Sequence, residues 1–179
     1  MLETLISSRT RIKLLVRLFL NPGNSAHLRG LATEFQESTN AVRLELNKFE
    51  QAGMVTAETS GNKKIYRANS DHPLFRDINS ILLKYVGLDR IIEAVIGKLG
   101  DLDFVFLTGD YARGTDSGLI DLIFVGNLER EYLAGIVSKA ETLVGKKIRY
   151  ITYEPAEWAT IAEKEVISGK NLLLWEKTQ

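Results

Sequence analysis

Apolar residues recur every three or four positions through the first third of the chain, which is the spacing of amphipathic helices. One such helix is predicted over residues 3–20. The segment 21–23 ends it, because proline cannot continue the hydrogen-bond ladder and glycine frees the backbone. A second helix is predicted from about Ala26, and a third from about residue 38 to about Gln51. Two short helices separated by a tight turn are typical of a helix-turn-helix.

The third predicted helix has one apolar side and one polar side. Ser38 or Thr39 is a suitable N-cap, and Gly53 is placed to end the helix. The apolar positions are Val42, Leu46 and Phe49. The polar positions that we predict to contact DNA are Thr39, Asn40, Arg43, Asn47 and Lys48. Arginine and asparagine offer the bidentate geometry that base edges of the major groove accept, so Asn40, Arg43 and Asn47 are predicted to contact bases.

A β-hairpin is predicted directly after this helix, with strands at residues 54–59 and 64–68 and a turn at 60–63. Its cationic side chains, Lys63, Lys64 and Arg67, suit contacts with phosphates. The stretches HLRGLATEFQESTNAVRLELNKFEQAGMV and NKKIYRAN together resemble the winged helices of ArsR-like bacterial and archaeal repressors. The resemblance implies a winged helix-turn-helix over residues 1–70 that binds double-stranded DNA.

A helical connector is predicted over residues 71–100, after the break at Pro73. Its apolar stripe comprises Leu74, Ile78, Ile81, Leu82, Tyr85 and Val86, and Gly87 interrupts it. This is more apolar surface than one packing face needs, so we expect a two-fold homodimer through this helix. His72, at the junction, is expected to cap or pack rather than to bind a ligand.

Strands and helices alternate after Leu102, which predicts an α+β fold for the whole chain with a small mixed sheet in this part. The predicted strands cover residues 102–107, 119–125, 147–153 and 172–175. The predicted helices cover residues 129–144 and 155 to about Ser168, with Pro155 at the first helical position.

Between the first two of these strands lies the motif LTGDYARGTDSGLIDLIFVG, residues 107–126. With NSDHPLFRDINSILLKYVGL before it and KKIRYITYEPAEW after it, the chain resembles winged-helix regulators fused to a minimal nucleotidyltransferase-like domain. The resemblance places that domain at residues 101–179. In the nucleotidyltransferase superfamily, a Gly-Ser turn holds phosphate, and an Asp-x-Asp pair with a third carboxylate from a later strand holds divalent metal.

Measured against that pattern, much of the site's chemistry is missing. Gly109 is retained, but Asp110 stands where the serine is expected and Leu119 where the first carboxylate is expected. Asp121 matches the second carboxylate, and the strand 147–153 contains no acid. Because Mg²⁺ needs several oxygen ligands, we expect a degenerate site without catalysis, metal or cofactor. Arg113 and Tyr111 are retained, so binding of nucleotide with Mg²⁺ stays as the alternative.

Composition adds little except through charge. Residues 1–70 carry ten Lys/Arg against six Asp/Glu, and the remainder carries thirteen against seventeen. A basic first part joined to an acidic second part fits a nucleic-acid module fused to another domain. The chain has no cysteine, which excludes disulfides and thiolate metal sites. No apolar run approaches the ~20 residues that span a bilayer, and no signal-peptide pattern is present, so a cytoplasmic protein without membrane partners is expected.

The sequence therefore predicts a transcriptional regulator, most simply a repressor, whose second domain serves dimerisation or the sensing of a small-molecule effector. Two alternatives stay open. One is an active nucleotidyltransferase that uses divalent metal and a nucleoside triphosphate. The other is an antitoxin-like module in which the winged helix binds protein instead of DNA.

Overall fold

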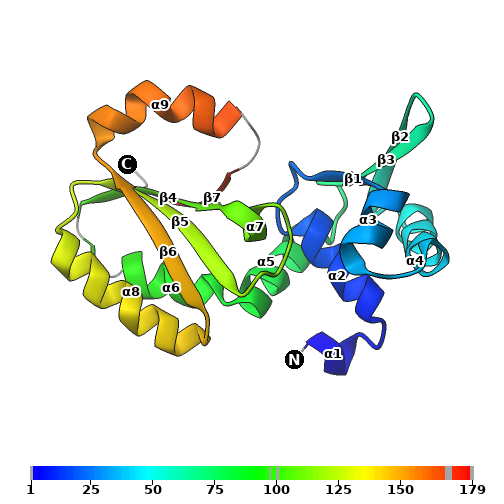
Figure 1. Ribbon diagram of the computed structural model, residues 1–179, viewed down its shortest axis with the longest axis horizontal. Helices are drawn as coiled ribbons and strands as arrows, with labels where there is room; N and C mark the ends of the chain where they lie inside the picture. Colours follow the sequence, from blue (N-terminus) through cyan, green and yellow to red (C-terminus); the bar gives the residue numbers. More distant parts are fainter. Residues whose placement is uncertain (1, 97, 100, 168–170, 178–179) are drawn as a thin grey trace. The chain divides into compact units, whose positions relative to one another are not determined.

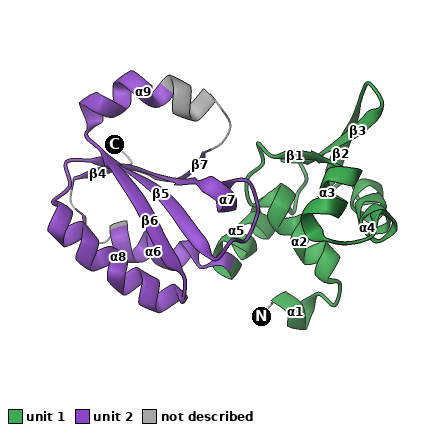
Figure 2. Ribbon diagram, in the orientation of Figure 1, with its two compact units in different colours: residues 1–85 green, residues 86–179 purple. Residues whose placement is uncertain are grey.

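The computed structural model describes residues 2–96, 98–99, 101–167 and 171–177. The chain is α+β and divides into two compact units, Met1–Tyr85 and Val86–Gln179 (Figure 2). Unit 1 contains a three-stranded sheet and unit 2 a four-stranded sheet. None of the described helices is long and apolar enough to cross a membrane.

The first predicted helix is in fact two helices, α1 (Leu2–Leu5) and α2 (Arg9–Phe19), so the prediction of one continuous helix was wrong. Ser8 has an extended backbone conformation, and its hydroxyl accepts a hydrogen bond from the Arg11 N–H at 3.2 Å. An N-cap of this kind begins a new helix and cannot lie inside one. Helix α2 supplies much of the core of unit 1 through side chains that are almost fully buried: Leu14, Leu18 and Phe19.

The second helix begins later than predicted, because Ser25–His27 forms strand β1, which pairs with β3. His27 ends the strand and caps helix α3 (Leu28–Phe35): its Nδ1 accepts a hydrogen bond from the Gly30 N–H at 2.9 Å. Ser38 caps helix α4 (Thr39–Gln51) by accepting from the Ala41 N–H at 3.1 Å, which confirms the predicted start of that helix.

The predicted hairpin is confirmed as β2 (Val55–Ser60) and β3 (Lys63–Ala68), which are antiparallel, and the sheet order is β1-β3-β2. A two-residue turn joins the strands, and Gly61 in it has φ +58°. Figure 1 shows this hairpin projecting from the helices of unit 1. Helix α5 (Phe75–Val86) follows, and the His72 Nδ1 accepts a hydrogen bond from the Leu74 N–H just before it, as expected for a capping histidine.

Unit 2 follows the predicted alternation of strands and helices. Its elements are α6 (Leu88–Ile96), β4 (Leu102–Thr108), α7 (Gly109–Ala112), β5 (Leu119–Gly126), α8 (Arg130–Val144), β6 (Lys147–Tyr153), α9 (Pro155–Ile167) and β7 (Leu172–Glu176). Only the short helix α7 was not predicted. The expected end of α9 at Ser168 lies outside the described residues. The strand order is β6-β5-β4-β7, with β5 and β6 parallel and the other pairs antiparallel.

The two faces of this sheet are covered by different helices. Figure 1 shows α9 over one face and α6 and α8 over the other. Trp158 of α9 packs with Phe106, Ile123 and Val125 in one buried cluster. Because side chains alternate along a strand, Asp121 lies on this same face of β5, two residues before Ile123. Asp121 therefore lies on the same face of the sheet as the Trp158 cluster, next to the part of that face that Trp158 covers.

Candidate functional site

The outward side of α4 is polar and open to solvent. Thr39, Asn40, Arg43, Asn47 and Lys48 are all exposed, whereas Val42, Leu46 and Phe49 are buried on the opposite side. The Arg43 Nη2 donates to the Asn40 Oδ1 at 2.6 Å, so these two side chains form one polar group on the helix surface. Leu44 is 52% exposed beside them, which gives the face one apolar contact as well.

Glu45, on the same helix, is buried and holds two cations. The Arg11 Nε donates to it at 2.8 Å, and the Lys48 Nζ lies 3.3 Å away. Burial alone would raise the pKa of Glu45, but the hydrogen bonds and charges of Arg11 and Lys48 outweigh it, and the pKa is lowered. The carboxylate therefore stays ionised and fixes Lys48 at the edge of the polar side of α4.

The hairpin adds positive charge in the same unit. Lys63, Lys64 and Arg67 are exposed. Lys64 is held in place: its Nζ lies 2.8 Å from Glu50 and 5.3 Å from the centre of the Tyr66 ring. The hydrogen bond that Lys64 donates to Glu50 raises the pKa of Lys64.

A hollow of about 610 Å³ separates this hairpin from the start of α3. Its lining includes Lys63, Lys64 and Arg29. The sequence analysis did not select Arg29. Arg29 lies in the first turn of α3. This position follows from the observed helix start at Leu28 and not from the predicted start at about Ala26.

In unit 2 the retained glycine and the retained carboxylate lie against each other. Strands β4 and β5 pair Thr108 with Asp121, and Gly109 follows with φ +67°. A Cβ at Gly109 would lie 2.2 Å from the Asp121 Oδ2, closer than real atoms approach. The position therefore requires glycine both for its backbone conformation and for the space that the Asp121 carboxylate occupies.

Arg149 completes this site, and the sequence analysis did not identify it. In the parallel pairing of β5 with β6, Arg149 stands directly beside Asp121, and its Nε donates to the Asp121 Oδ1 at 2.6 Å. Asp121 is 8% exposed. The hydrogen bond and charge of Asp121 raise the pKa of Arg149. A hollow of about 300 Å³ lies over the pair, and its lining includes Thr108 and Gly109.

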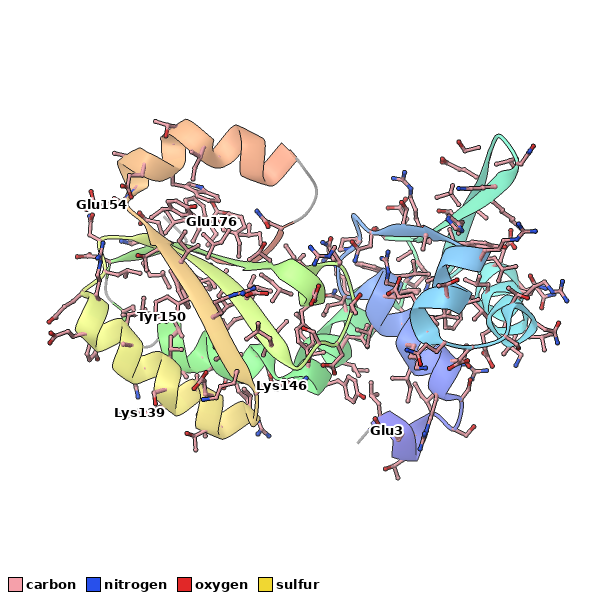
Figure 3. All side chains as sticks on the ribbon, in the orientation of Figure 1. Glu3, Lys139, Lys146, Tyr150, Glu154 and Glu176 are labelled. Atoms are coloured by element: carbon pink, nitrogen blue, oxygen red, sulfur yellow. The ribbon has the colours of Figure 1, made fainter. Side chains whose placement is uncertain are left out.

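The other charged residues of the motif are paired elsewhere. Asp110 binds Arg113. The fully buried Tyr111 donates its hydroxyl hydrogen bond to Asp116, and Lys146, between α8 and β6 in Figure 3, donates to the Tyr111 oxygen and lies 3.3 Å from Asp116. Burial raises the pKa of Asp116, but these two partners outweigh that effect and lower it. Asp116 is thus held by its own partners, while Asp121 binds Arg149.

The residues present do not fit a divalent cation. Leu119 has no ligand atom, Asp121 is already paired, and the residue beside Asp121 on the later strand, Arg149, is itself a cation. Within the described ranges, no group of three or more histidine, cysteine, aspartate or glutamate side chains is placed to hold a metal. Mg²⁺ requires several oxygen ligands in tight geometry, and this arrangement supplies one carboxylate.

No protein-family model and no curated protein matches the chain. Solved structures match about half of it. Reduced HlyU from Vibrio cholerae is 15% identical over 49% of this chain and 83% of its own, with a TM-score of 0.38. A protein from Archaeoglobus fulgidus is 22% identical over 52% and 98%, with a TM-score of 0.38. A complex of tri-AMPylated HEPN toxin with MNT antitoxin from Shewanella oneidensis matches at 14% identity over 52% and 73%, with a TM-score of 0.39. These scores are too low to establish a shared fold.

Proposed function

We propose that the chain is a DNA-binding transcriptional regulator in which unit 1 is a winged helix-turn-helix. In this assignment α3 and α4 form the helix-turn-helix, and β2 and β3 form the wing. The observation that carries the proposal is the exposed polar side of α4, which belongs to the same compact unit as a hairpin rich in lysine and arginine. A recognition helix enters the major groove, and a wing contacts the neighbouring phosphates.

Base contacts are assigned to Asn40, Arg43 and Asn47. They stand three and four residues apart on α4, so they line one side of the helix. Arg43 suits guanine and the two asparagines suit adenine, because each pairs with two atoms of the base edge. The hydrogen bond that Arg43 donates to Asn40 holds the arginine along this side. On binding DNA, this hydrogen bond must be replaced by hydrogen bonds to a base.

Phosphate contacts are assigned to Thr39, Lys48, Lys63, Lys64 and Arg67, and the structure adds Arg29. Thr39 is the first residue of α4, where the helix N-terminus favours a phosphate. Arg29 faces the hollow that Lys63 and Lys64 also line, so one phosphate there would meet three cations. Contacts of this kind provide affinity at all sequences and make it fall with salt concentration.

The proposal is tested by selecting bound sequences from a random DNA pool with the full chain and then measuring the selected site by fluorescence anisotropy. The Arg43→Ala variant should weaken that site by about 1–3 kcal/mol, roughly 5- to 150-fold. Arg76→Ala is the matched control, because it removes the same charge from an exposed position on α5. Equal losses in both variants would show a general charge effect and reject α4 as the reading surface. Failure to enrich any DNA at low salt would favour a protein-binding module.

For unit 2 we propose a role without nucleotidyl transfer, in dimerisation or in sensing a small effector. Support comes from the pairing of Asp121 with Arg149 at the expected metal position. Incubation with Mg²⁺ or Mn²⁺ and each labelled nucleotide should give no transferred label. Transfer that disappears in Asp121→Ala would reject this assignment.

We further propose a homodimer through helix α5 of unit 1. Leu74, just before α5, and Ile81 are 54% and 46% exposed and stand seven residues apart, which places them on one side, while Leu82 is buried on another. Asp77 and Lys84 stand next to this side. Asp77 is as far from the start of α5 as Lys84 is from its end. In a two-fold antiparallel pair of α5 helices, Asp77 of each copy meets Lys84 of the other, so the surface is complementary to itself.

A further inference from the structure

Arg149 stands where the sheet geometry brings a side chain closest to Asp121. The two residues are register partners on parallel strands, and their contact of 2.6 Å uses the Nε of the arginine and the Oδ1 of the aspartate. Asp121 is buried and needs a positive partner, since an unpaired carboxylate there would be costly. The guanidinium supplies that charge from within the chain.

The same guanidinium has a second edge that Asp121 does not use. A guanidinium carries five N–H donors in a planar fork, and the contact with Asp121 engages only Nε. Within the part of the chain that the structure describes, Arg149 makes no other hydrogen bond, and its side chain is 71% exposed. Arg149, which carries these unused donors, lines the 300 Å³ hollow. Thr108 and Gly109 line it as well.

We propose that Arg149 takes the place of a divalent cation in unit 2 and that its free edge binds the oxyanion group of a small ligand directly. Phosphate and carboxylate each offer two oxygens to the planar, bidentate fork of an arginine. Asp121 holds the guanidinium in position, as a carboxylate holds a metal, and its own charge is neutralised by doing so. The negative charge of Asp110 also acts on Arg149, and the ion pair of Asp110 with Arg113 offsets part of its repulsion of an anionic ligand. The hollow is at the lower end of the volumes that small-molecule sites have.

This inference deepens the sensing role proposed for unit 2, because it gives the effector a chemical class. It does not require that unit 1 bind DNA. The binding experiment below uses no DNA, so its failure and the failure of the DNA-binding assignment are separate results.

The first experiment titrates the full chain with AMP, ATP, citrate and inorganic phosphate by calorimetry, once in EDTA and once in Mg²⁺. At least one of these anions should bind in EDTA, so that binding does not require Mg²⁺. Arg149→Gln should weaken binding about 10- to 100-fold, the value of charge-assisted hydrogen bonds. Arg149→Lys should fall between the two, because it keeps the charge but loses the fork. Lys147→Gln, an exposed cation two residues earlier on β6, is the control and should bind like the parent.

The second experiment introduces carboxylates so that unit 2 can bind a divalent cation in place of the Arg149 guanidinium. In the double variant Leu119→Asp, Arg149→Asp, three carboxylates share one face of β5 and β6. This variant should bind Mn²⁺, detected by loss of the free-ion electron paramagnetic resonance signal, whereas the parent should not. Tryptophan fluorescence of both proteins verifies that unit 2 is folded. Anion binding that requires Mg²⁺, Mn²⁺ bound by the parent and lost in Asp121→Asn, or no binding of any of the four anions would each overturn the proposal.

Discussion

Replacing Gly109 with alanine should destabilise unit 2 through its contact with Asp121. The backbone of Gly109 has φ +67°, and an added Cβ would lie 2.2 Å from the Asp121 Oδ2 and 2.9 Å from its Cγ. Asp121 cannot turn away freely, because it is 8% exposed and its Oδ1 accepts from Arg149 at 2.6 Å. The alanine variant must therefore bear a strained backbone and also displace a buried, paired carboxylate.

Each of these two effects has a known scale. An L-residue with positive φ costs about 1–2 kcal/mol. Displacing Asp121 forfeits its hydrogen bond to Arg149 and leaves a buried acceptor without a partner, which costs about 1–3 kcal/mol. The lower part of that range applies, because the Arg149 side chain is 71% exposed and water replaces part of what it loses. The expected loss for Gly109→Ala is thus roughly 2–4 kcal/mol of unfolding free energy.

Urea unfolding followed by tryptophan fluorescence measures this loss in the right place, because both tryptophans of the chain, Trp158 and Trp175, belong to unit 2. Gly145→Ala is the matched control. Gly145 has φ +66°, and a Cβ there would meet nothing within 4 Å, so it should lose only the backbone part, about 1–2 kcal/mol.

A double-mutant cycle isolates the contact itself. In an Asp121→Ala background the carboxylate is gone, so Gly109→Ala should cost no more than Gly145→Ala does. The reasoning is refuted if Gly109→Ala and Gly145→Ala cost the same in the parent chain. It is also refuted if the cost of Gly109→Ala does not change when Asp121 is removed.

Three further predictions concern charge and association. Lys64→Gln should remove one phosphate contact and reduce the salt dependence of non-specific DNA binding by about 0.9 in log–log slope, measured by anisotropy; an unchanged slope would remove Lys64 from the interface. Ile81→Glu should shift the chain from dimer to monomer in sedimentation equilibrium, while Ser80→Glu, on a different side of α5, should not; a parent that is already monomeric contradicts the assignment. The pKa of Asp116 is lowered in the folded state, so its stabilising contribution is present above the ordinary value of 3.8 and is lost as pH falls. The parent should therefore lose more unfolding free energy than Asp116→Asn between about pH 5 and about pH 3, and equal losses would exclude Asp116 as the cause.

Periodicity along the chain predicted most elements of the fold, because each helix or strand must bury one side of itself. It predicted the hairpin of unit 1 and strand β6 at Lys147–Tyr153 to within a residue or two. It missed the break before α2, because Leu5 and Ile12 stand seven residues apart, as on one side of a helix, although residues 7–11 between them are all polar. It also missed strand β1, whose three residues are too few to show alternation and are held by pairing with β3.

The candidate site of unit 2 shows the same limit more sharply. The motif alone selected Gly109 and Asp121, since they lie within thirteen residues of each other. Arg149 follows Asp121 by 28 positions and meets it only because β5 and β6 are parallel and in register. The sequence showed that this strand carries no acid, but it did not show that Arg149 on the strand pairs with Asp121. The helix between the two strands was predicted, but the residue-by-residue register of β5 with β6 was not.

The exchange of a metal for an arginine also changes how the site behaves when it is empty. Three carboxylates on neighbouring strands repel one another unless a cation is bound, so such a site is stable only when loaded. Asp121 and Arg149 neutralise each other without any ligand, and the geometry of both is therefore fixed before an effector arrives. A preformed donor edge loses little freedom on binding, which favours reversible recognition. Arg149→Asp alone should therefore lower the stability of unit 2 in the absence of metal, measured by the same tryptophan unfolding assay, because it sets two carboxylates side by side. Added Mn²⁺ should recover part of the loss in the Leu119→Asp, Arg149→Asp variant but none in the parent, and equal stability of the parent and Arg149→Asp would contradict the argument.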